Sequence, residues 1–258
     1  MSGILNWLLV TGYRSLVTDS VTGFHSLVSA NCQLRTTRGE NMSDKKCVII
    51  AGGSLNDVEF HKEIVAQADF LICADGGARH AKRMGLLPDL VVGDFDTLTE
   101  LELEELWIAG VSLEQYPREK DFTDTHLALL KALEMGYTQV DLLGCLGGRF
   151  DHTYANVMLL ALPQGRHAKI RIVDETQEIM LVSRTMVLEG ERGNQVSLLP
   201  LSQVVTGIRT EGLLYQVPGG TFTMGVPNGI SNVFAEKRVS IEIGEGLLLV
   251  IRLREERI

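Results

Sequence analysis

Short apolar runs alternate with helix-like stretches between residues 47 and 162, and this alternation constrains the fold more than any other feature. The runs at 47–51, 70–74 and 90–92 are continuously apolar, as buried parallel strands are, and each stops at a glycine or an aspartate. Further runs at 111–116 and 140–143 continue the series. The stretches between the runs predict helices at 57–67, 78–84, 99–109, 122–135 and 151–162. This order predicts a parallel sheet with helices on both faces.

The second half of the chain has a different pattern. After a run at 169–173, short β-rich runs follow at 178–183, 186–189, 195–199, 204–209, 238–243 and 247–253. Turn residues separate these runs, which is typical of an antiparallel sandwich or barrel. Aspartate is also absent beyond residue 174, although it is frequent between residues 75 and 151. We therefore place a domain boundary near 163–174, with an α/β domain at 42–165 and an all-β domain at 166–258.

Composition excludes several classes of protein. A hydrophobic content of 45% is ample for a packed core. No apolar run approaches the roughly 20 residues that span a bilayer. With 24 basic and 33 acidic residues the net charge is −9, which argues against nucleic acid as the main partner. The four cysteines have neither CxxC nor metal-ligand spacing, so they predict reduced core thiols in a cytoplasmic protein.

Residues 1–41 differ from the rest of the sequence. They are rich in Ser and Thr, show no clear periodicity, and lack the basic start and long apolar run of a signal peptide. Met42 leads directly into the first predicted strand. We therefore expect residues 1–41 to be a disordered extension or to precede the natural start. A targeting segment or a real added element is the alternative.

Acidic motifs follow the predicted strands: DGG at 75–77, GDFD at 93–96, KDFTD at 120–124 and GGRFD at 147–151. In an open parallel sheet the carboxyl ends of the strands form one ligand-binding edge, so these motifs are predicted to converge. Converging carboxylates require cations, and hard oxygen ligands suit Mg²⁺ that is shared with phosphates. We predict that Asp94, Asp96 and Asp121 hold the metal, with Asp124 and Asp151 nearby as metal support or base.

Glycine pairs at 76–77 and 147–148 precede predicted helices. Such turns suit phosphate groups, because the free N–H groups and the helix dipole point at the anion. Lys120 and Arg149 would add positive charge. Together these groups predict phosphoryl or pyrophosphoryl transfer, in which catalysis is mainly positioning and charge neutralisation. The chain has neither GxxxxGK[ST] nor GxGxxG, which argues against a P-loop NTPase and an ordinary Rossmann dehydrogenase.

Structural roles stay open for single residues. Asp121 or Thr123 could cap the helix that begins near residue 122, and Asp151 could cap the next one. The glycine pairs could be tight strand-to-helix turns. Asp141 lies at the start of a strand and is expected to be solvated. The two acids of the DFD motif are harder to explain by packing, because they flank a phenylalanine of buried type at a strand end.

Five motifs occur in order and together resemble the thiamine pyrophosphokinase family: ADGGA at 74–78, PDLVVGDFD at 88–96, KDFTD at 120–124, GGRFDH at 147–152 and GISN at 229–232. The resemblance covers about residues 47 to 253. It implies an N-terminal Rossmann-like α/β catalytic domain, a C-terminal β-sandwich and a homodimer. It also implies Mg²⁺-dependent transfer of the β,γ-pyrophosphoryl group of ATP to the thiamine hydroxyl, giving thiamine diphosphate and AMP.

The resemblance, with the strand-end argument, assigns roles to residues. The catalytic residues would be Asp94, Asp96, Asp121, Asp124, Arg149 and Asp151. The ATP contacts would be Asp75, Gly76, Gly77, Lys120, Thr123, Gly147 and Gly148. Tyr215 matches the family position whose ring stacks on thiamine from the other subunit, and Ser231 and Asn232 match the pair that binds its pyrimidine end. Two positions depart from the family pattern: Thr97 stands where Ser is usual, and Leu214 where Lys is common.

Two other functions remain open from the residues. One is a different Mg²⁺-dependent transferase, such as a nucleotide-sugar enzyme that uses the DFD motif for its metal. The GISN element and the all-β second half argue against it. The other is a non-catalytic sensor of nucleotide or thiamine that has kept the fold. The intact acidic and basic motifs argue against this loss of chemistry.

Overall fold

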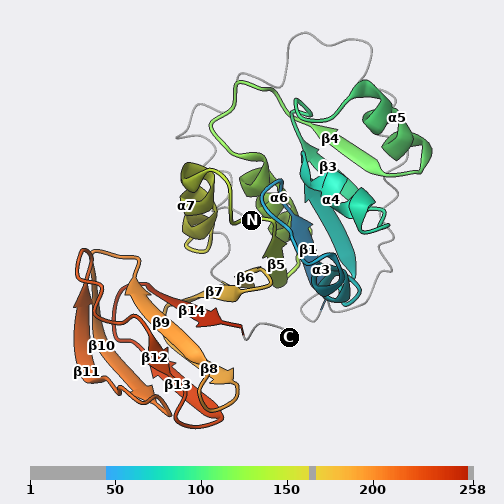
Figure 1. The fold of residues 1–258 in the computed structure, drawn as a ribbon. Coiled ribbons are helices and arrows are strands. Elements are labelled where there is room, and N and C mark those ends of the chain that lie inside the picture. Colours follow the sequence, from blue (N-terminus) through green and yellow to red (C-terminus); the bar gives the residue numbers. More distant parts are fainter. Residues whose placement is uncertain (1–44, 163–166, 255–258) are drawn as a thin grey trace. The chain divides into compact units, whose positions relative to one another are not determined.

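Six parallel strands form the first part of the structure: β1 (Lys46–Ile50), β2 (Phe70–Ala74), β3 (Leu90–Gly93), β4 (Ser112–Gln115), β5 (Gln139–Leu143) and β6 (Lys169–Val173). They lie in the order β6-β5-β1-β2-β3-β4 (Figure 1). The structure is a computed structural model that describes residues 45–162 and 167–254. The central strands are almost fully buried, which explains their continuously apolar sequence.

Helices cover both faces of this parallel sheet: α3 (Val58–Val65), α4 (Gly77–Arg83), α5 (Glu100–Ile108), α6 (Asp124–Glu134) and α7 (Phe150–Leu159). Apolar side chains of α3, α4 and α5 pack in one cluster with one face of the strands. Those of α6 and α7 pack in a second cluster on the other face. The predicted alternation and the predicted two-sided cover are both confirmed.

Local sequence signals set the helix ends. Asp57 caps α3 by accepting a hydrogen bond from Phe60 N, and Thr99 and Glu102 form a reciprocal capping box at the start of α5. Thr123 caps α6 by accepting a hydrogen bond from His126 N. This is the structural role that the sequence left open for Thr123. Asp151 does not cap α7, because the capping position is Arg149 and no side-chain hydrogen bond is made there.

The second half continues the same sheet and adds a second one. Antiparallel strands extend the parallel sheet beyond β6: β7 (Gln177–Val182), β14 (Leu248–Leu253), β9 (Gln195–Pro200) and β12 (Asn232–Val233). Four strands form the other sheet: β8 (Thr185–Glu189), β10 (Val204–Glu211), β11 (Pro218–Thr223) and β13 (Arg238–Glu242). A third apolar cluster lies between the two layers, which confirms the predicted antiparallel sandwich.

Strands β11 and β12 were not predicted from the sequence. Strand β11 begins with Pro-Gly-Gly, a turn signal, and β12 has only two residues. These two strands are stabilised by pairing with β10 and β9, and not by the strand preference of their own residues. The domain boundary near 163–174 stays a prediction, since β6 and β7 pair directly across it within one sheet. The prediction for residues 1–41 lies outside the described residues.

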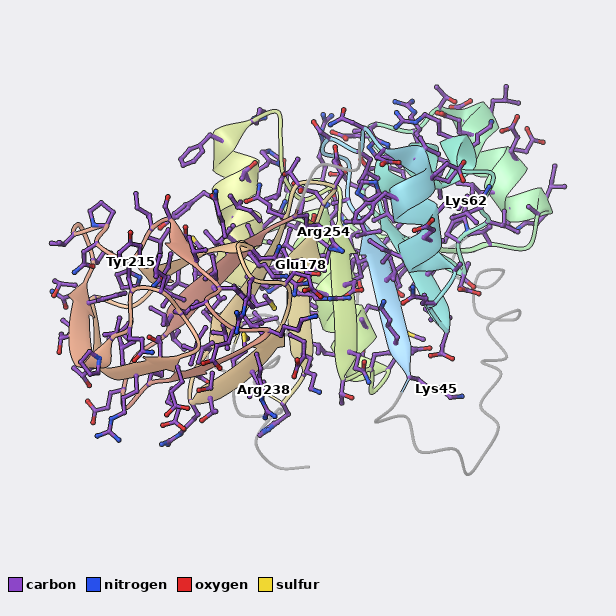
Figure 2. The ribbon with its side chains drawn as sticks, turned by 60° about the horizontal axis from the view of Figure 1, so that its bottom comes forward. Lys45, Lys62, Glu178, Tyr215, Arg238 and Arg254 are labelled. Atoms are coloured by element: carbon purple, nitrogen blue, oxygen red, sulfur yellow. The ribbon has the colours of Figure 1, made fainter. Side chains whose placement is uncertain are left out.

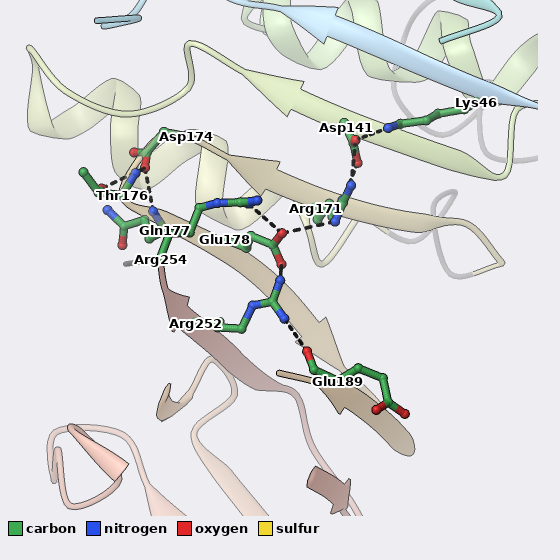
Figure 3. Close-up of polar contacts among 10 residues, drawn as sticks. All are labelled: Lys46, Asp141, Arg171, Asp174, Thr176, Gln177, Glu178, Glu189, Arg252 and Arg254. Atoms are coloured by element: carbon green, nitrogen blue, oxygen red, sulfur yellow. Dashed lines mark hydrogen bonds and ion pairs between the residues drawn. The ribbon is translucent and has the colours of Figure 1, made fainter. Parts of the chain in front are cut away.

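A buried carboxylate joins the strands where the sheet changes from parallel to antiparallel. Glu178 on β7 is 3% exposed and forms ion pairs with three arginines (Figure 3). Its carboxylate oxygens lie 3.3 Å from Arg171 Nη1, 2.9 Å from Arg252 Nη2 and 2.9 Å from Arg254 Nη1. These arginines come from β6, from β14 and from the residue after β14, so the network connects the two halves of the sheet.

Asp141 belongs to the same network, which corrects the expectation that it is solvated. It is 3% exposed, because β5 lies inside the sheet between β1 and β6. Lys46 Nζ lies 2.7 Å from its carboxylate, and Arg171 donates to both carboxylate oxygens at 2.5 and 2.9 Å. Burial alone would raise the pKa of Asp141, but these two cations lower it below its ordinary value.

Cys47, Cys73 and Cys145 are buried and unpaired, as predicted for core thiols. Cys32 lies outside the described residues. Burial raises the pKa of all three described thiols well above the ordinary value, so none is a reactive thiolate. Among the helices of the described residues, none is long and apolar enough to cross a membrane.

We predict that Glu178→Gln lowers the free energy of unfolding by about 3–5 kcal/mol, because it removes the carboxylate that three guanidinium groups share. Urea denaturation measures the change. Glu189→Gln is the matched control: its side chain is exposed and only its backbone carbonyl accepts a hydrogen bond from Arg252. We expect it to stay within about 0.5 kcal/mol of the wild type. Equal effects of the two substitutions would contradict a role for the buried network.

Candidate active site

Asp75 follows β2 directly and has left-handed backbone angles, with φ of 42°. Such a conformation is unusual for a residue with a side chain and is found at functional sites. The carboxyl is 6% exposed. Its Oδ2 accepts a hydrogen bond of 2.6 Å from Thr97 Oγ1, whereas Oδ1 is buried and has no hydrogen-bond partner in the structure. One oxygen of Asp75 is therefore available to a ligand.

Asp94 and Asp96 follow β3 and flank Phe95, which is also left-handed with φ of 61°. This turn buries Phe95 in the core to 8% exposure and leaves the two acids at the edge of the sheet. Asp94 Oδ1 accepts a hydrogen bond from Asp96 N at 3.2 Å. The sequence indicated this arrangement, because packing explains the phenylalanine but not the acids beside it.

Asp124 is the first residue of α6 and completes a cluster of three carboxylates. One oxygen each from Asp75, Asp94 and Asp124 lies within 4.8 Å of the others. Gly93 permits this approach, because a Cβ at that position would lie 2.9 Å from Asp75 Cβ and 3.3 Å from Asp124 Cγ. The elements β2, β3 and α6 thus each bring one carboxylate to the same point.

Lys120 is the cation next to this cluster. Its Nζ lies 2.7 Å from Asp124 Oδ1 and 3.2 Å from Asp94 Oδ2, and its side chain is only 10% exposed. Burial would lower the pKa of Lys120, but the adjacent carboxylates of Asp124 and Asp94 raise it above the ordinary value. The lysine is therefore charged, and it balances part of the negative charge that the carboxylates bring together.

The electrostatic states of Asp75 and Asp94 differ. Burial raises the pKa of Asp75, and its hydrogen bond from Thr97 only partly opposes this effect. Burial would also raise the pKa of Asp94, but Asp96 N and Lys120 lower it below the ordinary value. The folded protein therefore stabilises the negative charge of Asp94 and destabilises that of Asp75. A bound cation would offset the destabilisation at Asp75.

The predicted metal set was Asp94, Asp96 and Asp121, and the structure brings together a different triplet. Asp96 forms an ion pair of 2.9 Å with Arg118, whose side chain is 79% exposed. Asp121 is exposed and does not belong to the cluster. Only Asp94 is common to the two sets, so the complete predicted set stays a prediction. Asp75, which we predicted as an ATP contact, occupies the cluster instead.

One glycine of each pair lies where close packing requires it. A Cβ on Gly77 would collide with the carbonyl oxygen of Ile50, and one on Gly147 would collide with the side chain of Ser54. Gly76 is the capping residue of α4, and Gly148 is left-handed at the loop before α7 with open space around it. Gly77 and Gly147 thus permit close packing, whereas Gly148 does not, and the phosphate contacts of all four glycines stay a prediction.

Arg149 and Asp151 form an exposed ion pair at the start of α7. Arg149 Nη2 lies 2.5 Å from Asp151 Oδ2, and the arginine side chain is 74% exposed. The hydrogen bond from Arg149 lowers the pKa of Asp151 to about 2. Both side chains are therefore charged and open to solvent, and the described residues place no ion pair between them and the carboxylate cluster.

The second group of predicted residues lies on the sandwich. Tyr215, labelled in Figure 2, is 65% exposed, and Ser231 is exposed with a left-handed φ of 56°. Asn232 is buried, and its side-chain amide binds the backbone of Tyr215. The structure therefore brings these three residues to one place, although sixteen to seventeen positions separate Tyr215 from the other two.

Sequence reasoning gave no site role to two residues that the structure places next to the carboxylates. Thr97 orients Asp75, and Gly93 lets Asp75 and Asp124 approach. A signal for both was present, since each is part of the short segment around the DFD motif. Spacing alone did not show which side chain would meet Asp75, because that contact joins the ends of two different strands.

Two family descriptions match the chain. Residues 61–173 match the catalytic domain of thiamin pyrophosphokinase, and residues 184–248 match its vitamin B1 binding domain. Thiamine pyrophosphokinase of Bacillus subtilis (strain 168) is 30% identical over 206 residues, which cover 79% of this chain and 96% of that protein. Thiamine pyrophosphokinase 1 of Oryza sativa subsp. japonica is 27% identical over 216 residues, covering 73% of this chain and 80% of that protein.

Solved structures agree with the sequence relatives. The crystal structure of the Bacillus subtilis enzyme superposes with a TM-score of 0.71 at 28% identity, covering 82% of this chain and all of that one. The thiamin pyrophosphokinase of Geobacillus thermodenitrificans gives a TM-score of 0.70 at 28% identity, covering 82% of this chain and 99% of that one. The matches include both the carboxylate cluster and the sandwich that carries Tyr215. This chain belongs to the thiamine pyrophosphokinase family.

Proposed function

We propose that this transferase moves the β,γ-pyrophosphoryl group of ATP to the hydroxyl of thiamine with the help of Mg²⁺, giving thiamine diphosphate and AMP. The observation that carries the proposal is the carboxylate cluster of Asp75, Asp94 and Asp124 at the carboxyl ends of β2 and β3. In a doubly wound sheet this edge is where nucleotides bind. Family membership specifies the acceptor, and the cluster supplies the chemistry that pyrophosphoryl transfer needs.

The residues present fit Mg²⁺. Carboxylate oxygens are the protein ligands that this ion prefers, and Asp75 Oδ1 is buried without a hydrogen-bond partner. Asp75, Asp94 and Asp124 would hold the ion, with Asp96 and Asp121 as further candidates from the sequence. When bound, Mg²⁺ neutralises charge on the phosphates and orients them for attack.

The chain's own residues supply positioning and charge. Lys120 adds a positive charge at the cluster, and Arg149 offers a planar, fully charged guanidinium for the transferred group. Gly76, Gly77, Thr123, Gly147 and Gly148 remain the proposed backbone and hydroxyl contacts to ATP. Asp124 or Asp151 would accept the proton that the thiamine hydroxyl loses as it attacks the β-phosphorus.

The acceptor side of the site would lie on the sandwich. The cationic thiazolium ring of thiamine suits the exposed face of Tyr215, and Ser231 offers an exposed hydroxyl for the pyrimidine end. We propose that a homodimer brings Tyr215 of one subunit to the carboxylates of the other. Large apolar side chains are exposed on both parts, including Phe150 at 78% and Leu214 at 58%, and these are available to a partner subunit. We propose that the dimer acts in the cytoplasm.

One assay tests the function. Purified protein is incubated with ATP, Mg²⁺ and thiamine, and the products are separated by chromatography. We expect AMP and thiamine diphosphate in equal amounts. ADP as the nucleotide product would indicate transfer of a single phosphoryl group, and the absence of any turnover with thiamine would indicate a sensor or a different acceptor.

We predict that Asp75→Asn, Asp94→Asn and Asp124→Asn each lower kcat at least about 100-fold and abolish stabilisation by Mg²⁺. At a Mg²⁺ concentration a hundredfold above Kd, the wild-type melting temperature should rise by roughly 5–10 °C. Asp96→Asn is the comparison that separates the two candidate metal sets. Loss of the Mg²⁺ response in Asp96→Asn, with retention in Asp75→Asn, would favour the set predicted from sequence.

Without metal, Asp75→Asn should keep or raise the melting temperature near neutral pH. The folded pKa of Asp75 lies above its ordinary value, so its charge opposes folding once the pH exceeds that value. The stabilisation by the substitution should therefore be present at pH 7 to 8 and disappear in acid, where the native carboxyl is neutral. Melting curves over this pH range, with a chelator present, measure it. A destabilised Asp75→Asn protein at every pH would contradict this charge state.

We predict that Arg149→Lys lowers kcat at least about tenfold, because lysine keeps the charge but not the planar fork. Steady-state kinetics with saturating ATP and thiamine measure the effect. Arg184→Lys, at an exposed turn of the sandwich, is the control and should leave kcat unchanged. If Arg149→Ala and Arg149→Lys alter only the melting temperature, the arginine is structural.

We predict that activity returns when two inactive chains are mixed. One chain carries Asp94→Asn, and the other carries Tyr215→Ala with Ser231→Ala. A site shared between subunits would leave up to one intact site in each heterodimer. Activity is measured after subunit exchange has been shown by native mass spectrometry. Demonstrated exchange without recovered activity would mean that each site is built from a single chain.

A further inference from the structure

The segment that carries Tyr215 is held against the segment at 232–236. Leu214 N donates to Val233 O at 2.8 Å, and Ala235 N donates to Gly212 O at 2.8 Å. Leu213 and Phe234 form an isolated antiparallel bridge, and each is only 1% exposed. Backbone pairing therefore fixes residues 212 to 214. Beyond Leu214 the main chains no longer pair with each other.

The side chain of Asn232 continues the pairing where the backbone stops. Its Oδ1 accepts from Tyr215 N at 3.1 Å, and its Nδ2 donates to Tyr215 O at 2.7 Å. The same Oδ1 also accepts from Val233 N at 2.8 Å. Because a primary amide presents an acceptor and a donor side by side, it can bind both backbone groups of one residue, as a neighbouring strand would.

The backbone around Ser231 explains why a side chain is needed here. Ser231 has a left-handed φ of 56°, which turns the chain away just before Asn232, and its N–H donates to Ser197 Oγ at 3.1 Å. The main chain of this turn therefore bonds elsewhere. Asn232 is 6% exposed, and both amide heteroatoms are engaged with the protein itself.

We propose that Asn232 is a positioning residue of the thiamine site, which acts by fixing the backbone of Tyr215 and so the place of its ring. The proposal rests on the proposed function, in which Tyr215 stacks on the acceptor. It differs from the role that the family resemblance gives Asn232, a direct contact with the pyrimidine end. Tyr215 is 65% exposed, so its own side chain has little packing to hold it and its location depends on its backbone.

A double-mutant cycle distinguishes positioning from contact. If Asn232 acts through Tyr215, Asn232→Ala should raise the KM for thiamine about five- to thirtyfold and leave the KM for ATP unchanged. Once Tyr215→Ala has removed the ring, adding Asn232→Ala should change the KM for thiamine less than about twofold. If the double mutant instead shows the product of the two single-mutant increases in the KM for thiamine, the proposal is overturned, since Asn232 would then contact the substrate independently.

Asn232→Asp tests the amide chemistry at constant size. The carboxylate keeps an acceptor for Tyr215 N but places a second oxygen against Tyr215 O, where the amide donates. We expect it to raise the KM for thiamine as much as Asn232→Ala does. Ser202→Ala is the control, because Ser202 holds another turn of the sandwich through hydrogen bonds to Val204 O and from Leu247 N. It should lower the melting temperature without changing the KM for thiamine.

Amide hydrogen exchange tests the contact without any substrate. In Asn232→Ala the amide of Tyr215 should exchange at least about tenfold faster, while the amides of the β10–β13 ladder keep their protection. Unchanged exchange at Tyr215 would overturn the proposal even if the enzyme is active. A protein with the faster exchange but no turnover of thiamine would instead refute the proposed function and leave the backbone contact established.

Discussion

Three carboxylates whose oxygens lie within 4.8 Å of one another repel, and the rest of the structure must hold them there. The parallel strands do this through buried backbone pairing, which leaves β2 and β3 no freedom to separate. Gly93 has no side chain to keep Asp75 and Asp124 apart, and Lys120 offsets part of the negative charge of the carboxylates. The site is thus a locally unfavourable arrangement that a stable sheet imposes, as expected where a ligand is to supply the missing interaction.

The same sheet gives the second half of the chain a fixed frame. Because β7 pairs with β6, and β14 with β7, the sandwich begins as a direct extension of the catalytic sheet. The buried carboxylate of Glu178 joins these strands through ion pairs with three partly exposed arginines. Ion pairs of this kind add less to stability than to specificity, since each partner is costly to bury alone. Slippage between β6, β7 and β14 would leave such a charge unpaired.

Much of the fold was readable from periodicity, because buried parallel strands and capped helices carry strong local signals. Strands β11 and β12 were not, since tertiary partners stabilise them against their own composition. At the site, the DFD motif pointed to Asp94 because its acids have no packing role, and the structure places Asp94 in the carboxylate cluster. The expectation that Asp141 is solvated was wrong, because the sequence shows a charged residue in a strand but not the two cations, Lys46 and Arg171, that pair with it. Which carboxylates meet depends on strand order, and no single motif contains that information.

The left-handed residues that carry side chains in the described part of the chain are Asp75, Phe95 and Ser231. Asp75 and Ser231 are proposed to bind the metal or the substrate, and the buried Phe95 lies between Asp94 and Asp96. Each such backbone costs of order 1–3 kcal/mol unless the surroundings enforce it. Glycine at position 231 would relax the turn, yet it would remove a hydroxyl from the acceptor side. Substitutions that relieve this backbone strain would raise thermal stability, but at Asp75 and Ser231 they would also remove groups proposed to bind the metal or the substrate. Thermal stability and turnover therefore conflict at these positions.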